Sequence, residues 1–393
     1  MTNVTVIGDG QLARMMQPAA IELGITLRVL AGSPDASAAQ VIPEVIHGDY
    51  TSLEDLQRAA EDSDAVTFDH EHVPTEHLRA LQSAGINVHP GPDALIYAQD
   101  KLLMRERLRE LGAPVPEFAA INSIDDALAF SAQVGGQVCL KARRGGYDGK
   151  GVWFPEGADI VSLVGELLDA GTPLMAERKV DLARELSALC ARSATGEVRS
   201  WPVADSVQKD GVCFTAQAPA AALPQPWISE RLGSDAPAGT GLEALTELAE
   251  YIATSLGVTG VLAVELFQEK DGRVLVNELA MRPHNTGHWT QDGSVTSQFE
   301  QHLRAVLGWP LGDTSLLAPT VVMANTLGDT QGARDVMNLY PDVKVHVYGK
   351  QARPGRKVGH VNLCGTDPDA TLQRATEAAA IVVGGINDAQ GRN

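Results

Sequence analysis

Cysteine is scarce in this sequence, with four among 393 residues. Cys139, Cys190, Cys213 and Cys364 lie far apart, and no two of them form a Cys-x-x-Cys pair. Disulfide-rich domains and structural zinc sites both need closely spaced cysteines. The cysteine pattern therefore indicates neither a disulfide framework nor a zinc site.

Positive charge is also in short supply, because 31 Lys and Arg residues stand against 50 Asp and Glu residues, for a net charge of −19. Such a field repels phosphate backbones, so we expect no nucleic-acid partner. No apolar run reaches the length of a membrane span, and the first eight residues lack the basic and apolar regions of a signal peptide. We therefore expect a cytoplasmic protein with no membrane partner.

Aromatic residues make up 5% of the chain, while hydrophobic residues make up 44%, so the predicted core is aliphatic. The length allows two or three domains. Strand and helix signals alternate over residues 1–98, which predicts an α/β domain with a parallel sheet. Its expected strands lie at 4–7, 27–30, 45–46 and 65–68.

The rest of the chain mixes helices and strands in a less regular order. Helices are expected at 100–111, 160–168 and 242–256, and a last helix from residue 370. Strands are expected at 173–177, 184–189, 320–323 and 343–347.

The turn Gly8-Asp9-Gly10-Gln11-Leu12-Ala13 matches the glycine pattern of dinucleotide sites. A glycine turn at a helix N-terminus binds phosphate well. However, the second strand ends in Ala31-Gly32-Ser33, without the acidic residue that holds a ribose. The pattern therefore favours another phosphorylated ligand over NAD. Glu71, which follows the strand at 65–68, is a candidate substrate contact because open α/β sheets bind ligands at strand carboxyl ends.

The segment 141–151 contains four glycines and four cations between two apolar runs. Two short strands joined by such a loop predict a hairpin with an open, mobile tip. Glycine amides and Lys or Arg side chains can surround an anion. The segment is therefore either a flap over polyphosphate or a solvated basic loop, and it contains no Walker A motif.

Two apolar strands at 261–267 and 274–279 flank Asp271-Gly272, a preferred centre for a two-residue type I′ turn. With that centre, paired residue numbers sum to 543, which places Glu265 directly opposite Glu278. Facing carboxylates inside apolar strands need a shared proton or a cation, unless both reach solvent. Paired carboxylates with substrate phosphates are a usual way to hold magnesium. We therefore expect a Mg²⁺ site here.

Two further polar segments follow. The loop 281–291 is dense in Arg, His and Asn, which is typical of a site, and Arg282 is suited to stabilising a transferring phosphoryl or carboxyl group. The segment 350–360 carries four Lys or Arg residues within eight positions. In so acidic a chain this cluster predicts a phosphomonoester pocket, with a solvated face as the alternative.

These stretches together resemble the ATP-grasp superfamily and, within it, the family of N5-carboxyaminoimidazole ribonucleotide synthetases. The resemblance extends over nearly the whole chain. It is carried by five segments: GDGQLARM (8–15), RRGGYDGKG (143–151), NELA (277–280), RPHNTGHWT (282–290) and RPGRKVGH (353–360). Ala13 stands where the family usually has glycine, and Asp69-His70 replaces a more apolar acidic pair.

The resemblance implies three sets of site residues. The residues implied at the reacting groups are Tyr147, Asp148, Arg282, His284 and Asn285. The residues implied at ATP are Lys101, Lys141, Gly146, Tyr147, Asp148, Gly149, Lys150, Gly151, Val152, Glu177, Arg178, Lys179, Val180, Glu185, Gln208, Asn277 and Glu278. The residues implied at the ribonucleotide are Gln11, Glu71, Lys350, Arg353, Arg356 and Lys357. Gln208 stands where the family often has histidine, and Glu265 and Glu278 are implied as the magnesium ligands.

The implied activity is ATP-dependent carboxylation of 5-aminoimidazole ribonucleotide with bicarbonate, through carboxyphosphate, in purine biosynthesis. The implied architecture is a Rossmann-like domain (1–98), an ATP-grasp domain (99–310, with a lid at about 114–177) and a small C-terminal domain (311–393), assembled as a homodimer. Two alternatives remain open: another ATP-grasp ligase, such as a formate-dependent glycinamide ribonucleotide transformylase, and a non-catalytic nucleotide-binding or NAD-dependent protein.

Overall fold

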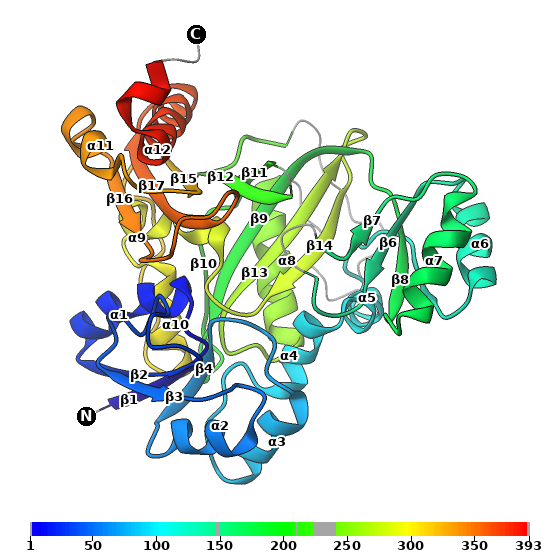
Figure 1. Ribbon diagram of the computed structural model, residues 1–393, viewed down its shortest axis with the longest axis horizontal. Helices are drawn as coiled ribbons and strands as arrows, with labels where there is room; N and C mark the ends of the chain where they lie inside the picture. Colours follow the sequence, from blue (N-terminus) through cyan, green and yellow to red (C-terminus); the bar gives the residue numbers. More distant parts are fainter. Residues whose placement is uncertain (1, 147–149, 210, 224–240, 391–393) are drawn as a thin grey trace.

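The structure is a computed structural model that describes residues 2–146, 150–209, 211–223 and 241–390. Its N-terminal part is a parallel sheet in the order β3-β2-β1-β4, drawn in blue in Figure 1. The strands are β1 (Thr2–Ile7), β2 (Ile25–Ala31), β3 (Glu44–His47) and β4 (Ala65–Phe68). The helices are α1 (Gln11–Leu23), α2 (Leu53–Ala60), α3 (Thr75–Ser83) and α4 (Pro92–Gln99). The predicted parallel α/β sheet is confirmed, although α3 and α4 were not predicted.

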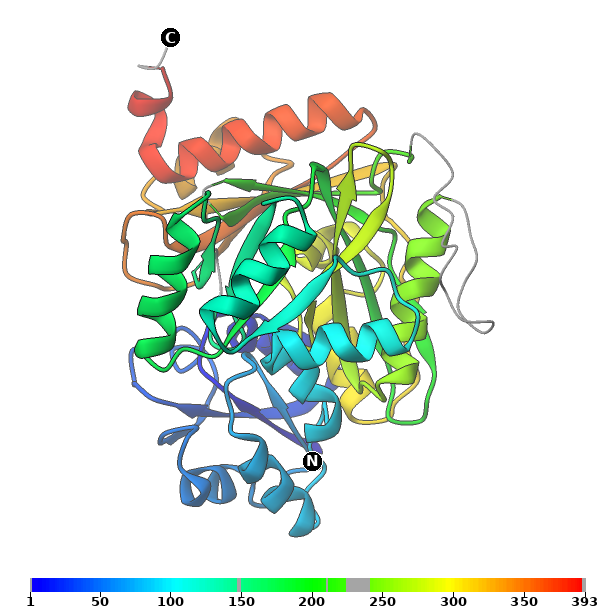
Figure 2. The same ribbon diagram turned by 90° about the vertical axis from the view of Figure 1, so that its right-hand side faces the viewer.

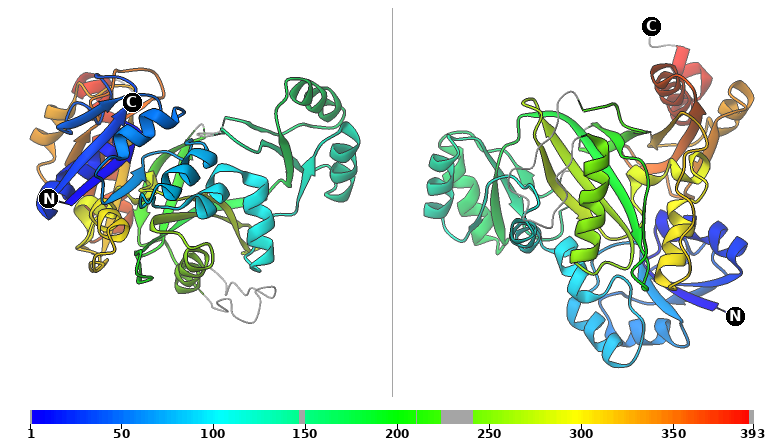
Figure 3. Two further views of the ribbon diagram at one scale, coloured as in Figure 1. Left: turned by 90° about the horizontal axis from the view of Figure 1, so that it is seen from below. Right: turned by 180° about the vertical axis from the view of Figure 1, so that it is seen from behind.

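The second part is a small four-stranded sheet that projects to one side of the molecule, as Figures 1 and 3 show. Its order is β5-β8-β6-β7, and two helices pack on it through an aliphatic core. The elements are β5 (Phe118–Ile121), α6 (Ile124–Gln133), β6 (Val138–Ala142), β7 (Val152–Trp153), α7 (Asp159–Asp169) and β8 (Leu174–Arg178). We call this module, residues 118–178, the lid. The helix α5 (Lys101–Glu110) precedes it and begins at Asp100, whose carboxylate caps the first amides.

The third part is a long antiparallel sheet in the order β14-β13-β9-β11-β12-β15-β17-β16, with β10 beside β9. Its strands are β9 (Leu182–Arg192), β10 (Val198–Ser200), β11 (Ala204–Lys209), β12 (Val212–Ala218), β13 (Gly260–Glu269), β14 (Val274–Ala280), β15 (Thr320–Leu327), β16 (Lys344–Val347) and β17 (Lys357–Gly365). Because β12 pairs with β15, the C-terminal strands continue the central sheet. The sheet is therefore one body from the β13–β14 hairpin to β16.

Helices cover this sheet where its strands are apolar. They are α8 (Leu242–Ser255), η1 (Asn285–Gly287), α9 (Thr290–Gly293), α10 (Gln298–Val306), α11 (Ala333–Leu339) and α12 (Pro368–Gln390). Leu245, Leu248 and Ile252 recur at helical spacing on α8 and are fully buried in the largest apolar cluster, which confirms the predicted amphipathic helix. Figure 2 shows α12 lying along the C-terminal strands, which it contacts at β15 and β17. Among the described residues, no helix combines the length and apolarity that a membrane span requires.

The turn between β13 and β14 differs from the prediction. Glu269 donates its amide to Arg273, so three residues rather than two form the turn, and Gly272 occupies it with φ +92°. Paired numbers near the turn therefore sum to 542, as in Leu266 with Val276. A β-bulge at Asn277 then shifts the register. The prediction of a two-residue turn was therefore wrong. From Glu265 toward the start of β13, however, the bulge restores the predicted pairing, so that Glu265 still lies opposite Glu278.

Candidate active site

Glu265 and Glu278 face each other across the β13–β14 ladder. Both carboxylates are partly exposed, with side-chain exposures of 24% and 41%. Burial and the neighbouring Glu278 and Glu185 carboxylates raise the pKa of Glu265 above its usual range. A cation between the two carboxylates would relieve this repulsion. Among the described residues, no group of three or more His, Cys, Asp or Glu residues could hold a metal, so the site offers two protein carboxylates.

His284 lies against this carboxylate pair. Its Nε2 is 3.2 Å from Glu265 Oε1, and its Nδ1 is 2.9 Å from Thr286 Oγ1. Burial and nearby Arg282 lower the pKa of His284 well below its usual value, so the imidazole is neutral near pH 7. The next residue, Asn285, is buried and exchanges amide hydrogen bonds with Asn325 of β15. The loop after β14 is thereby anchored on the C-terminal part of the sheet.

Two of the predicted ATP lysines flank the hairpin. Lys101 Nζ is 3.6 Å from Glu278 Oε2, and Lys141 Nζ is 3.3 Å from Asn277 Oδ1. Lys141 is nearly buried and also pairs with Glu177 at 2.8 Å. The structure therefore places Lys101 from α5 beside Glu278, and Lys141 from the lid beside the preceding residue, Asn277.

Arg105 is a residue near this site that we did not predict from the sequence. Its side chain is fully buried, and its Nε is 2.7 Å from Glu177 Oε1. Burial opposes ionisation, but Arg105 and Lys141 outweigh it and lower the pKa of Glu177 to about 2. Glu177 therefore stays ionised and holds both cations. A basic residue on the apolar side of an amphipathic helix was the available signal, since Arg105 lies three positions from both Leu102 and Leu108.

Further predicted ATP residues lie on β8, β9 and β11 and in the link between β8 and β9. Arg178 pairs with Glu269 at 2.9 Å and with Glu117 at 3.0 Å, so it ties the lid to the β13 end. Lys179 and Val180 follow it directly on the chain. Burial raises the pKa of Glu185, and Gln208 donates a hydrogen bond to Ser206 at 3.1 Å. These residues lie where the last lid strand leads into the central sheet.

The glycine loop of the lid is only partly described. Lys141 pairs with Val152, which confirms the predicted hairpin, whereas Tyr147, Asp148 and Gly149 lie outside the described residues. A Cβ on Gly146 would lie 2.7 Å from the carbonyl oxygen of Lys150, and Gly151 has φ +73°. Both positions therefore require glycine.

Two basic side chains of the predicted flap form ion pairs within the protein. Arg143 and Arg144 lie 2.9 and 3.1 Å from Asp100 Oδ2, at the start of α5. They lower the pKa of Asp100, although its burial acts in the opposite direction. These arginines therefore clamp the lid hairpin to the start of α5.

The glycine turn before α1 is occupied by a carboxylate of the same chain. Gly10 donates its amide to Asp69, and a Cβ on Gly8 would also collide with that carboxylate. Burial raises the pKa of Asp69 to about 6. The anion position that the sequence pattern predicts is therefore taken by Asp69 at the carboxyl end of β4.

The substrate residues predicted at this end come together around Arg282. Its Nε is 2.9 Å from Glu71 Oε2, and the other carboxylate oxygen of Glu71 is buried without a hydrogen-bond partner in the described structure. Lys350 Nζ contacts Gln11 Oε1 in the first turn of α1. Asp69 lies close enough to both Arg282 and Lys350 for each to influence its pKa, so the structure brings together the segment after β4, α1, the loop after β14 and the C-terminal part.

Not all of the predicted Lys and Arg residues of the segment 350–357 lie close to the other site residues. Lys357 begins β17 and lies close enough to influence the pKa values of Glu265 and His284. Arg353 is exposed in the preceding loop, and Arg356 donates a hydrogen bond to the Gln351 carbonyl. Lys350 and Lys357 therefore approach the site, while the exposed Arg353 is not shown in contact with it.

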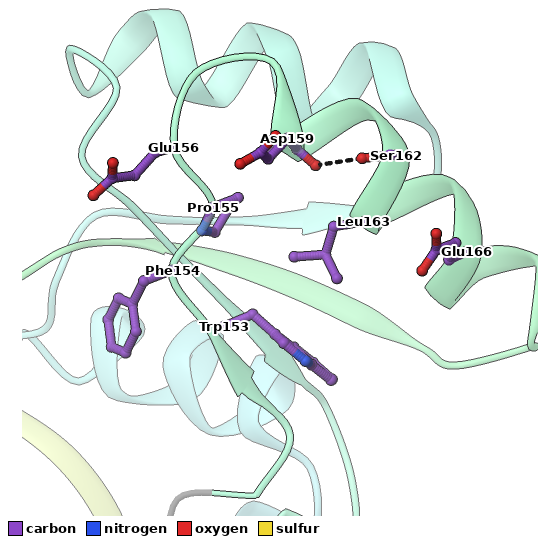
Figure 4. Close-up of a pocket in the computed structure, with 8 residues that line it drawn as sticks. All are labelled: Trp153, Phe154, Pro155, Glu156, Asp159, Ser162, Leu163 and Glu166. Atoms are coloured by element: carbon purple, nitrogen blue, oxygen red, sulfur yellow. Dashed lines mark hydrogen bonds between the residues drawn. The ribbon is translucent and has the colours of Figure 1, made fainter.

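A separate hollow of about 540 Å³ lies on the lid, between β7 and α7 (Figure 4). Trp153 and Leu163 line its apolar side, and Glu156, Asp159 and Glu166 lie around it. Its lining contains none of the predicted site residues. The hollow is therefore distinct from the carboxylate pair.

Three family models match consecutive parts of the chain. The ribonucleotide synthetase preATP-grasp domain matches residues 1–99, and the ATP-grasp domain matches residues 106–299. The phosphoribosylaminoimidazole carboxylase C-terminal domain matches residues 321–374. The first range covers the N-terminal sheet with its helices. The second covers the lid and the central strands β9 to β14, and the third covers the C-terminal strands β15 to β17.

Relatives and solved structures agree with these matches. The chain is 57% identical over 395 residues to the N5-carboxyaminoimidazole ribonucleotide synthase of Corynebacterium ammoniagenes, covering 98% of this chain and 92% of that protein. An ADP complex of N5-carboxyaminoimidazole ribonucleotide synthetase is similar with a TM-score of 0.85 and 32% identity, covering 96% of each chain. The Aspergillus clavatus synthase with ADP and 5-aminoimidazole ribonucleotide has a TM-score of 0.82 and 28% identity, covering 97% and 98%.

Proposed function

Because the chain belongs to the N5-carboxyaminoimidazole ribonucleotide synthase family of ATP-grasp ligases, we propose that it carboxylates 5-aminoimidazole ribonucleotide with bicarbonate and ATP. The products are N5-carboxyaminoimidazole ribonucleotide, ADP and phosphate, and the step belongs to purine biosynthesis. The observation that carries the proposal is the Glu265–Glu278 pair, with Lys101 beside Glu278 and the lid residue Lys141 beside Asn277.

ATP is proposed to bind between the lid and the central sheet. Lys101 and Lys141 would contact its phosphates, and the loop 146–152 would cover them. The segment 177–180 and Glu185 would line the base and ribose, with Gln208 and Asn277 beside them. The two buried or half-buried lysines supply the positive charge that phosphoryl transfer requires.

Magnesium would be held by Glu265 and Glu278 together with ATP phosphates. The facing carboxylates and the raised pKa of Glu265 fit a divalent cation with oxygen ligands. When bound, the ion supplies charge neutralisation at the phosphates. Neutral His284 beside Glu265 can hold this carboxylate in place through its Nε2 hydrogen.

The ribonucleotide is proposed to bind at the Arg282 end of the site. Lys350, Lys357, Arg356 and Arg353 would hold its phosphate, and Gln11 and Glu71 would orient the rest. The unpaired carboxylate oxygen of Glu71 is an acceptor for a donor on the substrate. Arg282, held by Glu71 at 2.9 Å, would stabilise carboxyphosphate, with His284, Asn285, Tyr147 and Asp148 around it.

The chemistry has two steps. Bicarbonate oxygen attacks the γ-phosphorus of ATP, the bond to ADP breaks, and carboxyphosphate forms. The exocyclic amine then attacks the carboxyl carbon of carboxyphosphate, or CO₂ released from it, so that phosphate leaves and the amine loses a proton. A closed lid would exclude water from carboxyphosphate.

Phosphate release measured with each substrate omitted tests the function. We expect release that depends on ATP, bicarbonate and 5-aminoimidazole ribonucleotide together. Replacing bicarbonate with formate, and the ribonucleotide with glycinamide ribonucleotide, tests the alternative ligase. ATP turnover that ignores the aminoimidazole substrate would overturn the assignment.

We also propose the division into domains at 1–98, 99–310 and 311–393, a cytoplasmic location and a homodimer. The dimer is supported only by the family. Sedimentation equilibrium of the full chain measures it, and a monomer at micromolar concentration would contradict it.

A further inference from the structure

Arg105 links three elements of the ATP site without lying in the proposed substrate sites. Its Nε donates to Glu177 of β8 at 2.7 Å, and its Nη2 donates to the backbone carbonyl of Asn277 at 2.7 Å. The guanidinium belongs to α5, so one side chain joins α5, the lid and β14. Its zero exposure means that solvent does not compete for these hydrogen bonds.

The carbonyl that Arg105 holds belongs to the bulged residue of β14. Asn277 is the extra residue between Val276, which pairs with Leu266, and Glu278, which pairs with Glu265. A bulge interrupts the ladder and leaves backbone groups without a strand partner. Arg105 supplies such a partner from a different element.

The bulge determines where the second carboxylate points. On the turn side, paired numbers sum to 542, and only the extra residue brings Glu278 opposite Glu265. The Asn277 side chain is held as well, since Lys141 lies 3.3 Å from its Oδ1 and also pairs with Glu177. The backbone carbonyl of Asn277 therefore binds Arg105 and its side chain binds Lys141, and both of these cations pair with the buried Glu177.

We infer that Arg105 is a positioning residue, which holds the Asn277 bulge so that Glu278 stands opposite Glu265 for a divalent cation. The inference rests on the proposed magnesium role of this pair. A guanidinium is required because two of its nitrogens reach two acceptors in fixed geometry, whereas a lysine ammonium cannot reproduce that fork. Removing partners that orient metal ligands typically costs about 10- to 100-fold in metal affinity.

The test compares Arg105→Lys with Arg107→Lys on the same helix, where Arg107 forms an exposed ion pair with Glu110. The full chain is titrated with Mn²⁺ in the presence of ADP, and free Mn²⁺ is measured by electron paramagnetic resonance. We expect Arg105→Lys to weaken Mn²⁺ binding by about 10- to 100-fold and Arg107→Lys to leave it unchanged. Circular dichroism and thermal melting establish that both variants are folded.

A second measurement reports on the bulge without metal. Hydrogen exchange of residues 274–280 in ligand-free protein is expected to be faster in Arg105→Lys than in Arg107→Lys. If Arg105→Lys binds Mn²⁺ as the wild type does while Glu278→Gln does not, the positioning role is wrong and the metal role stands. If Glu278→Gln also binds Mn²⁺ normally, the metal role itself is overturned, and the inference with it.

Discussion

At the residue scale, the site depends on a few side chains whose surroundings oppose their ordinary ionisation. Glu265 and Asp69 are held where carboxylates are costly, and His284 where an imidazolium is costly. Alternation and turn signals in the sequence predicted the Glu265–Glu278 pair. Arg105 was not predicted, because its partner carbonyl lies 172 residues away and the local pattern marks it only as a basic residue on the apolar side of α5.

Replacing Glu278 with Gln tests the carboxylate pair. The amide keeps the shape and removes the charge, so we expect turnover to fall by at least about 100-fold while the fold is kept. Glu247→Gln, on the exposed face of α8, is the matched control. Phosphate release and circular dichroism are the measurements, and near-normal turnover in Glu278→Gln would contradict the proposed role.

Asp69 predicts a pH dependence of stability. Its pKa is about 6 in the folded protein and 3.8 without the fold, so the folded state binds the proton more tightly. This contribution is complete below the unfolded pKa and is lost as the pH rises through about 6. At about 1.4 kcal/mol per pKa unit, the full contribution is about 3 kcal/mol, of which about 2 kcal/mol should be lost between about pH 4 and pH 7, relative to Asp69→Asn.

Urea unfolding of wild type and Asp69→Asn across this range measures the difference. Asp126→Asn is the control, because backbone hydrogen bonds lower the pKa of this exposed carboxylate. The contribution of Asp126 to the free energy of unfolding is complete above its unfolded pKa, so it should change little between about pH 4 and pH 7. Parallel curves for wild type and Asp69→Asn would contradict the prediction.

At the element scale, the sequence predicted most long strands and helices that have a clear period. It missed α10, although Ser297 accepts the Glu300 amide in the S-x-x-E pattern of a capped helix start. The hairpin shows a different limit. The position of Asp-Gly suggested a two-residue turn, and neither the third turn residue nor the bulge has a local signature. The missed turn residue and the missed bulge cancel at Glu265, so its predicted partner is correct. Between Glu265 and the turn, the predicted partners are each wrong by one residue.

Gly146 on the lid hairpin provides an element-scale prediction. An alanine Cβ there would lie 2.7 Å from the Lys150 carbonyl oxygen, so the loop must change its path. We expect Gly146→Ala to raise KM for ATP by about 10-fold with little loss of global stability, since misplaced substrate contacts cost up to about 100-fold.

Gly165→Ala on α7 of the same lid is the matched control. Its Cβ would meet Ile124 at 3.7 Å, an ordinary contact, and alanine should stabilise the helix by about 0.5–1 kcal/mol. Steady-state kinetics and thermal melting measure both variants. An unchanged KM in Gly146→Ala would show that the loop does not depend on this glycine for ATP binding.

At the scale of the whole molecule, the order of the central sheet could not be predicted from the sequence. The pairing of β12 with β15 joins residues about a hundred positions apart, and periodicity within a strand carries no information about its neighbour. Composition did predict a chain with substantial aliphatic cores, and these are present in each part. Because the net charge is −19, the local cations at the site must supply the attraction for the proposed anionic substrates.

Truncation after Gly312 tests the continuity of the sheet. It would expose the edge of β12 and uncover Ala216 and Ala218, which now pack with Val321 and Met323. An unpaired apolar edge strand promotes association, so we expect the fragment to aggregate at concentrations where the full chain is monodisperse. Light scattering compares the two, and a monodisperse fragment that binds ATP would contradict the shared sheet.

The continuous sheet has a consequence for inhibitor design. The β13–β14 hairpin and Lys357 at the start of β17 belong to the same sheet, so the anchors proposed for the nucleotide and the ribonucleotide stand at a constant separation. A compound that joins mimics of both substrates therefore needs a linker of one length. A stiff linker of that length should bind more tightly than a flexible one, because less conformational entropy is lost on binding.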